Sequence, residues 1–320
     1  MGHQTRRPRG GGGYRCRDGR AGKSATPNGG RRARATSRHV YVYIHTMEMS
    51  PFPERAWYAA NGLRDLVPDA GHLQHMPSHI DILCGHYYDA VVANNKAIVA
   101  DRKYLEREGQ LNYYTIYRSH NYHFKLYAAM FLGQYKTAMD TVNEMIATIP
   151  EALLRVEEPP MADWLESFIG MKMDVLIRFG KWQEIINEPL PDDPTLYCVT
   201  TTMIHYAKGI AHAALGNVEA AEEEKQRFLD AFATVPETRT VYNNKCRDIL
   251  AVAAEMLNGE IEYRKGNYEK AMNTRAPISL PGRQPALFRT LGLDATHPTR
   301  PWCALTRTRS CRRSRTSLSR

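Results

Sequence analysis

The chain has 320 residues, with 43 Lys and Arg against 34 Asp and Glu and a formal net charge of +9. The positive excess lies at the two ends, because residues 41–272 hold 22 basic and 32 acidic side chains. An acidic middle repels a phosphate backbone, so we expect no nucleic-acid partner. No run of residues reaches the roughly 18 apolar positions of a membrane span, so we expect no membrane partner either.

Two segments flank the acidic middle, residues 1–40 and residues 273–320. Each is rich in arginine, contains a single acidic residue and lacks hydrophobic periodicity. Such a segment cannot bury enough apolar surface to offset the entropy lost on ordering, so we predict that both are disordered. The scattered cysteines form no closely spaced pair, and we expect reduced thiols in a cytoplasmic protein. An arginine-rich start is also typical of an organelle transit peptide, which is the alternative.

Residues 41–272 read as one helix after another, with apolar residues recurring at three- and four-residue spacing and almost no strand signal. This pattern predicts an all-α fold. One unit recurs: a glycine, an aromatic or apolar residue two positions later, and an alanine or isoleucine three positions after that. Glycine in a left-handed conformation ends a helix and lets the chain reverse, so each unit predicts a helical hairpin. The five copies begin at Gly85, Gly133, Gly180, Gly216 and Gly266.

This unit, with a proline such as Pro150 at the end of a hairpin, resembles the tetratricopeptide repeat family. The resemblance covers residues 41–272 and implies an α-α superhelical solenoid in which each hairpin packs on its neighbours. The turn glycines are 48, 47, 36 and 50 residues apart, whereas the family repeats every 34 residues or so. We therefore expect additional helix or loop between repeats, for example at residues 102–118 and 150–163.

Three motifs carry a closer resemblance to one group of tetratricopeptide-like proteins, which implies a fold and no catalytic residues. The motifs are YIHTMEMS at residues 43–50, GHLQHMPSHI at residues 71–80 and YCVTTTMIHYA at residues 197–207. In that group the last repeat is typically followed by the run EPWGWMQPTR, whereas residues 288–298 here read FRTLGLDATHP. With suitable codons, a shift of one nucleotide converts one run into the other. We hypothesise that the reading frame is lost near Met272.

The family resemblance also brings six side chains into one groove. In tetratricopeptide repeats, positions 2, 5, 9 and 12 of the first helix line the concave surface where ligands bind. When the second and third repeats are aligned on Gly85 and Gly133 and the first on Ala56 and Pro68, these positions fall on three neighbouring repeats. The resemblance therefore implies a ligand-binding groove lined by His45, Glu48, His75, His79, His120 and His123.

Two kinds of ligand suit such a groove. The first hypothesis is a scaffold without catalysis or cofactor, which binds a peptide or protein partner among the His and Tyr side chains. The alternative is a metal-binding protein or metal-dependent enzyme, because several imidazoles suit Zn²⁺ or a similar divalent ion. Its ligands would be His45, His75, His79 and His123. Pro77 counts against this alternative, because a proline between His75 and His79 starts or kinks a helix.

A third hypothesis follows from the shifted reading frame. The chain would then be a truncated gene product without competent function. Loss of the last repeat would leave an apolar face uncovered, so we predict self-association through uncapped solenoid ends.

Overall fold

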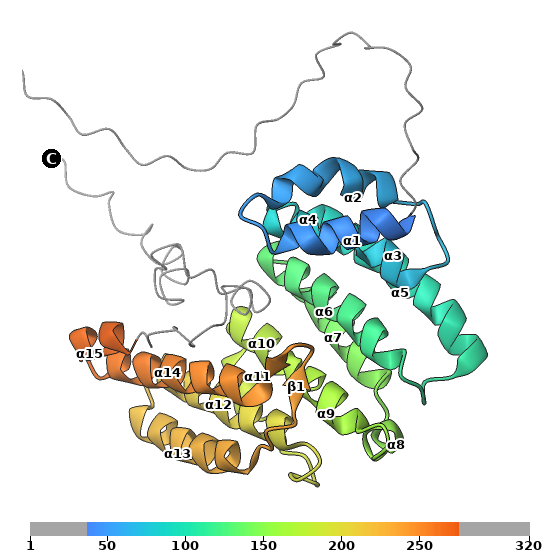
Figure 1. Ribbon diagram of the computed structural model, residues 1–320. Coiled ribbons are helices and arrows are strands. Elements are labelled where there is room, and N and C mark those ends of the chain that lie inside the picture. The colour runs from blue at the N-terminus through green and yellow to red at the C-terminus, as the bar shows by residue number, and fades with distance from the viewer. Residues whose placement is uncertain (1–36, 275–320) are drawn as a thin grey trace, which may run out of the picture.

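The computed structural model describes residues 37–274 and shows a mostly helical protein with one short β-hairpin (Figure 1). The prediction of an all-α fold is confirmed at this level. The disorder predicted for both ends and the shifted frame beyond Met272 lie largely outside the described residues. In the first half of this part, the elements are α1 (Ser37–Glu48), η1 (Pro53–Ala56), α2 (Trp57–Leu63), α3 (Gly71–His75), α4 (Pro77–Leu83), α5 (Tyr87–Glu108), α6 (Thr115–Phe131) and α7 (Tyr135–Ala147). In the second half they are α8 (Glu151–Leu154), α9 (Met161–Leu165), η2 (Glu166–Phe168), α10 (Met171–Arg178), α11 (Trp182–Ile186), α12 (Cys198–Ala214), α13 (Val218–Thr234), β1 (Thr240–Val241), β2 (Asn244–Lys245), α14 (Cys246–Arg264) and α15 (Tyr268–Asn273).

The first helix begins earlier than the predicted domain boundary at residue 41. It starts at Ser37, because Val40 already packs with Tyr41 against a small core formed by α1, α2 and α4. Ile44 is the fully buried residue that α1 contributes to this core. The core holds α1 in place, and α1 carries two of the predicted site residues.

The recurring glycines take the conformation that the repeat predicts. All five have positive φ, between 65° and 86°, and each lies between two helices. Side chains other than glycine rarely adopt this region, so glycine is the residue that lets each helix end and the next begin. In every unit the aromatic or apolar residue two positions later is the first residue of the next helix.

The long spacings between glycines have three structural origins. Between Gly85 and Gly133, α5 continues for 22 residues to Glu108 before a loop leads into α6. Between Gly133 and Gly180, the short helices α8 and α9 are inserted after Pro150. Between Gly216 and Gly266, the β-hairpin is inserted between α13 and α14. Figure 1 shows the helices progressing from α1 and α2 at one end of the molecule to α13, α14 and α15 at the other.

In residues 37–274 no helix is both long and apolar enough to cross a membrane.

Candidate metal centre

The helix that carries the predicted histidine pair is broken between the two residues. His75 ends α3 and Pro77 begins α4, and the intervening Met76 keeps helical backbone angles. Proline is well tolerated in the first turn of a helix, where its missing N–H has no partner to lose. The break does not separate the imidazoles, because His75 Nε2 and His79 Nε2 lie 2.8 Å apart.

The outer nitrogen of His75 is held by Asn94 of α5. Asn94 donates its Nδ2–H to the carbonyl of Ala90 at 2.8 Å, which fixes the orientation of the amide. Its Oδ1 therefore faces His75 Nδ1, at 2.7 Å, and can only accept. His75 Nδ1 must carry the proton of that hydrogen bond, so the Nε2 atom of the neutral ring presents a lone pair.

The outer nitrogen of His79 is held in the same way by Glu48 of α1. Glu48 Oε2 contacts His79 Nδ1, and Oε1 lies 2.9 Å from His45 Nδ1. Burial opposes the ionisation of Glu48, but hydrogen bonds from His45 and His79 lower its pKa to about 2. An ionised carboxylate only accepts hydrogen bonds, so His79 Nδ1 carries a proton, and in the neutral ring His79 Nε2 presents a lone pair. When both rings are neutral, two lone pairs face each other.

His120 of α6 supplies the third imidazole. One nitrogen each from His75, His79 and His120 lie within 4.8 Å of one another. The His120 ring centroid is 4.5 Å from that of His75. His120 Nδ1 is buried and has no hydrogen-bond partner among the described residues. A second group, His45, Glu48 and His79, meets the same distance criterion and shares His79 with the first.

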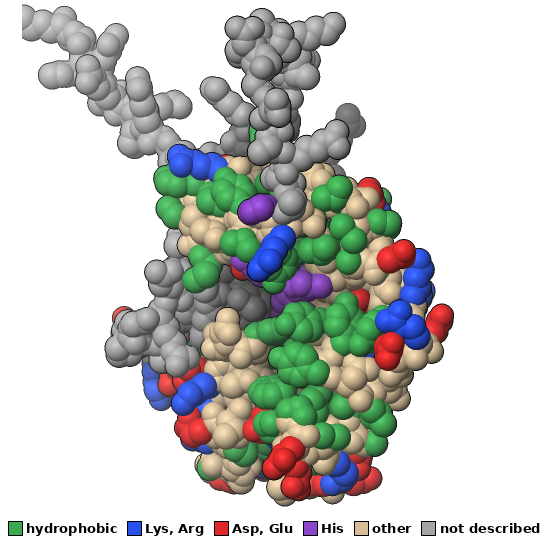
Figure 2. All heavy atoms as spheres, turned by 45° about the vertical axis from the view of Figure 1, so that its right-hand side comes forward, with side chains coloured by type: hydrophobic (Ala, Val, Ile, Leu, Met, Phe, Trp, Pro, Cys, Tyr) green, Lys and Arg blue, Asp and Glu red, His purple; other side chains and the backbone are tan. Residues whose placement is uncertain are grey.

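The structure therefore brings five of the six predicted residues together. The exception is His123, which belongs to neither group and whose ring lies 6.1 Å from those of Phe124 and Phe168. The predicted metal ligands included His123. In the group that the structure forms with His75 and His79, the third member is instead His120, one helical turn earlier on α6. His75 is 0% exposed and His79 8%, so neither lines an open surface. On the face drawn in Figure 2, histidine side chains reach the surface at more than one place, among hydrophobic side chains.

Two neighbours of the site were not predicted from the sequence. His72 lies within α3, and its ring centroid is 5.4 Å from that of His75. Asn94 lies in the middle of α5, where nothing in the sequence distinguishes a buried acceptor from an ordinary helix residue. For His72 a signal exists in its spacing, because it lies one turn from His75 on the same helix face.

Burial keeps most of these histidines neutral. Desolvation lowers the pKa of His72 to about 4, with smaller effects from nearby His79 and His45. Desolvation alone lowers the pKa of His123 to about 4. The pKa values of His75 and His120 are also lowered well below the ordinary value, first by burial and then by the neighbouring imidazoles. Neutral imidazole is the form that binds a metal ion.

These pKa shifts predict how the stability of the metal-free protein depends on pH. Each shifted histidine binds its proton less readily in the folded than in the unfolded chain, where its pKa is near 6.5. Between about pH 6.5 and pH 4 the unfolded state therefore binds more protons at these histidines, and their contribution to the free energy of unfolding falls as the pH is lowered. Burial raises the pKa of Asp81 to about 6 and also raises the pKa values of Asp101 and Glu166, so these carboxyls act in the opposite direction. The limiting slope is about 1.4 kcal/mol per pH unit for each such histidine.

Urea denaturation in the presence of a chelator, at a series of pH values from 7 to 4.5, measures this slope. His123→Phe should reduce it, because this histidine is buried outside both metal groups. If His123→Phe and the wild type have the same slope, the contribution of His123 to the pH dependence is absent and the prediction is wrong.

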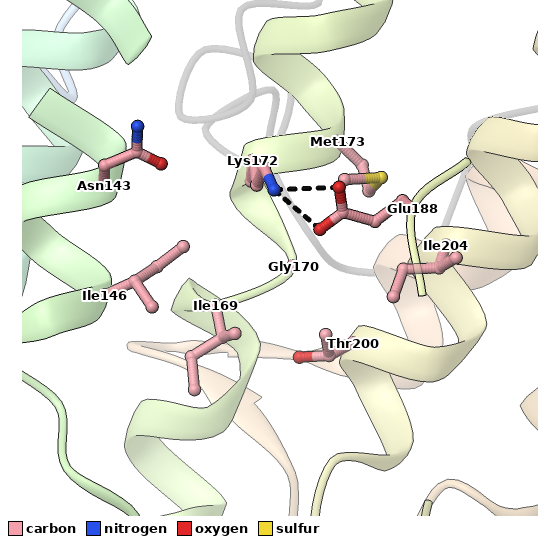
Figure 3. A pocket seen from close by; sticks show the side chains of 9 residues that line it. All are labelled: Asn143, Ile146, Ile169, Gly170, Lys172, Met173, Glu188, Thr200 and Ile204. Carbon is pink, nitrogen blue, oxygen red and sulfur yellow. Dashed lines mark hydrogen bonds and ion pairs between the residues drawn. The ribbon is translucent and has the colours of Figure 1, made fainter. Parts of the chain in front are cut away.

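A separate cavity of about 230 Å³ lies away from the histidines, between α7, α10 and α12 (Figure 3). Its polar lining is dominated by Lys172, whose Nζ pairs with both carboxylate oxygens of Glu188 at 2.7 and 2.8 Å. Because the two charges neutralise each other, the cavity has no unpaired ion to attract a charged ligand.

Comparisons with known proteins gave no family assignment. A scan against protein-family models, a search of curated proteins and a search of solved structures found no match for this chain.

Proposed function

We propose that this protein binds a divalent metal ion through His75, His79 and His120. The observation that carries the proposal is the 2.8 Å approach of His75 Nε2 to His79 Nε2, with both Nδ1 atoms committed as hydrogen-bond donors. Two lone pairs at this distance repel each other unless a cation lies between them. Imidazole nitrogens of this kind suit Zn²⁺, Cu²⁺, Ni²⁺ or Fe²⁺.

A shared proton is the alternative to a metal ion. A proton between His75 and His79 would satisfy two nitrogens and leave His120 Nδ1 buried without a partner. A metal ion accounts for the third imidazole as well. Two nitrogens bound to one tetrahedral Zn²⁺ at 2.0–2.1 Å lie about 3.3 Å apart, so the pair needs to open by only about 0.5 Å.

The surroundings resemble those of metal sites in proteins. Histidine ligands usually donate their other N–H to a carboxylate or carbonyl oxygen, which fixes the ring and raises its basicity. Glu48 and Asn94 act in this way for His79 and His75. Three protein ligands leave a fourth position for water or another small ligand, which is the arrangement of catalytic rather than structural zinc sites.

The proposal is tested by loading the purified protein with Zn²⁺ after treatment with a chelator. We expect one equivalent of zinc by elemental analysis after gel filtration. We also expect a rise in the melting temperature, since a ligand at 100 times its Kd stabilises the folded state by about 2.7 kcal/mol. If Zn²⁺, Cu²⁺, Ni²⁺ and Co²⁺ all fail to bind and to raise the melting temperature, the shared proton is the correct interpretation.

We further propose that the hairpins stack as an α-α solenoid of the tetratricopeptide type. Support comes from the five left-handed turn glycines and from the packing of consecutive long helices, such as α5 on α6 and α12 on α13. The expected peptide partner stays a prediction. A peptide would contact the partly exposed His45 rather than the buried His75.

A further inference from the structure

The β-hairpin between α13 and α14 contacts one of the histidines of the site. Its strands pair Thr240 with Lys245 and Val241 with Asn244, so Tyr242 and Asn243 form a two-residue turn. Tyr242 lies against α6, more than 120 positions away in the sequence, and its hydroxyl donates to the carbonyl of Ile116 at 2.8 Å. Ile116 is one helical turn before His120.

The Tyr242 ring packs directly on a proposed metal ligand. Its centroid is 4.5 Å from that of His120, the same separation that His120 has from His75. The opposite neighbour of Tyr242 is Phe168, at 6.0 Å and nearly perpendicular. His120 Nδ1 makes no hydrogen bond within the described part of the chain, so ring packing is what orients its imidazole.

The backbone of Tyr242 is unusual for a tyrosine. Its φ is 51°, in the left-handed region that two-residue hairpin turns normally fill with Gly or Asn. A bulky side chain at such a position is strained, and the surrounding structure has to offset that strain. Tyrosine occupies this position of the turn although Gly or Asn would fit the backbone conformation better.

A buried arginine fixes the hairpin to the rest of the protein. Arg239 donates to Asp163 Oδ1 and to the carbonyl of Leu196, both at 3.0 Å, and its own carbonyl accepts from the N–H of Cys246 at 2.9 Å. The hairpin also contacts α9 and η2, as its place beside α9 in Figure 1 indicates. The position of Tyr242 is thus set by segments of the second half together with its hydrogen bond to Ile116 of α6.

We infer that Tyr242 is a positioning residue of the metal centre, which holds the His120 imidazole toward His75 and His79 and slows release of the ion. This inference rests on the proposed metal binding. It links the C-terminal hairpin to a site whose three ligands all lie in the N-terminal half.

The test measures release of Zn²⁺ to an excess of chelator by stopped-flow, together with the visible spectrum of the Co²⁺-loaded protein. Tyr242→Asn suits the left-handed turn and removes the ring. It should speed Zn²⁺ release about 10- to 100-fold, as is typical for loss of a group that orients a ligand. Tyr242→Phe keeps the ring and loses one hydrogen bond, so about fivefold is expected. Tyr268→Asn, at an exposed tyrosine of α15, is the matched control.

The outcomes separate this inference from the proposed function. If the wild type binds Zn²⁺ and Tyr242→Asn leaves both the release rate and the Co²⁺ spectrum unchanged, Tyr242 has no positioning role and metal binding stands. If the wild type binds neither ion, the proposed function itself fails. A general loss of structure would alter circular dichroism of the metal-free variant, whereas a positioning role alters the Co²⁺ spectrum with that signal intact.

Discussion

His79→Ala is expected to weaken Zn²⁺ binding by about two orders of magnitude. Zinc sites with four ligands contribute about 10–16 kcal/mol, so one ligand is worth about 3 kcal/mol, or roughly a hundredfold in Kd. His79 has the largest expected effect because it is the member shared by both groups of ligand atoms. Competition with a chromophoric chelator measures the Kd. His86→Ala is the control, since His86 lies outside both groups and stacks on Trp57.

Variants of α1 decide which of the two groups holds the ion. If His75, His79 and His120 are the ligands, Glu48→Gln acts only through the orientation of His79 and should cost about 10- to 100-fold in Kd. His45→Ala should then cost less, because the hydrogen bond of His45 goes to the carboxylate and its ring only packs edge-on against His79. Should His45→Ala instead equal His79→Ala while His75→Ala binds normally, the ion would belong to His45, Glu48 and His79.

The sequence was sufficient for the local features of the fold. Each turn glycine is recognisable because the left-handed conformation depends on the residue itself and its immediate neighbours. The convergence of His45, His75 and His79 was predictable for a related reason. In stacked hairpins the position of a side chain within its own hairpin determines the surface that it faces.

The parts of the site that could not be predicted depend on contacts distant in sequence. Tyr242 reaches His120 only because Arg239 packs among Asp163 and Leu196, and no local pattern encodes that packing. The hairpin strands have two residues each, too short for an alternating pattern. The burial of His75 could not be predicted from the sequence either, because the position within a repeat indicates which way a side chain faces and not which residues cover it.

Gly71→Ala should destabilise the protein by about 3 kcal/mol and impair metal binding at the same time. A Cβ atom at Gly71 would overlap Asp101 Oδ1, and it would lie 3.0 Å from the carbonyl of Ala97. Asp101 is 1% exposed and accepts hydrogen bonds from Tyr114 and Asn121, each at 2.7 Å. The carboxylate cannot move without losing these bonds, so α3 has to shift instead, at a cost typical of overpacking.

That shift couples stability to the site, because α3 has five residues and His75 is the last of them. Urea denaturation of the metal-free protein gives the change in the free energy of unfolding, and the chelator competition gives the change in Kd. Gly62→Ala is the matched control: its Cβ would meet nothing within 4 Å, and alanine favours the helix, so a gain of up to about 1 kcal/mol is expected. If Gly71→Ala behaves like Gly62→Ala, Asp101 does not fix the position of α3, and the placement of His75 must depend on Asn94 alone.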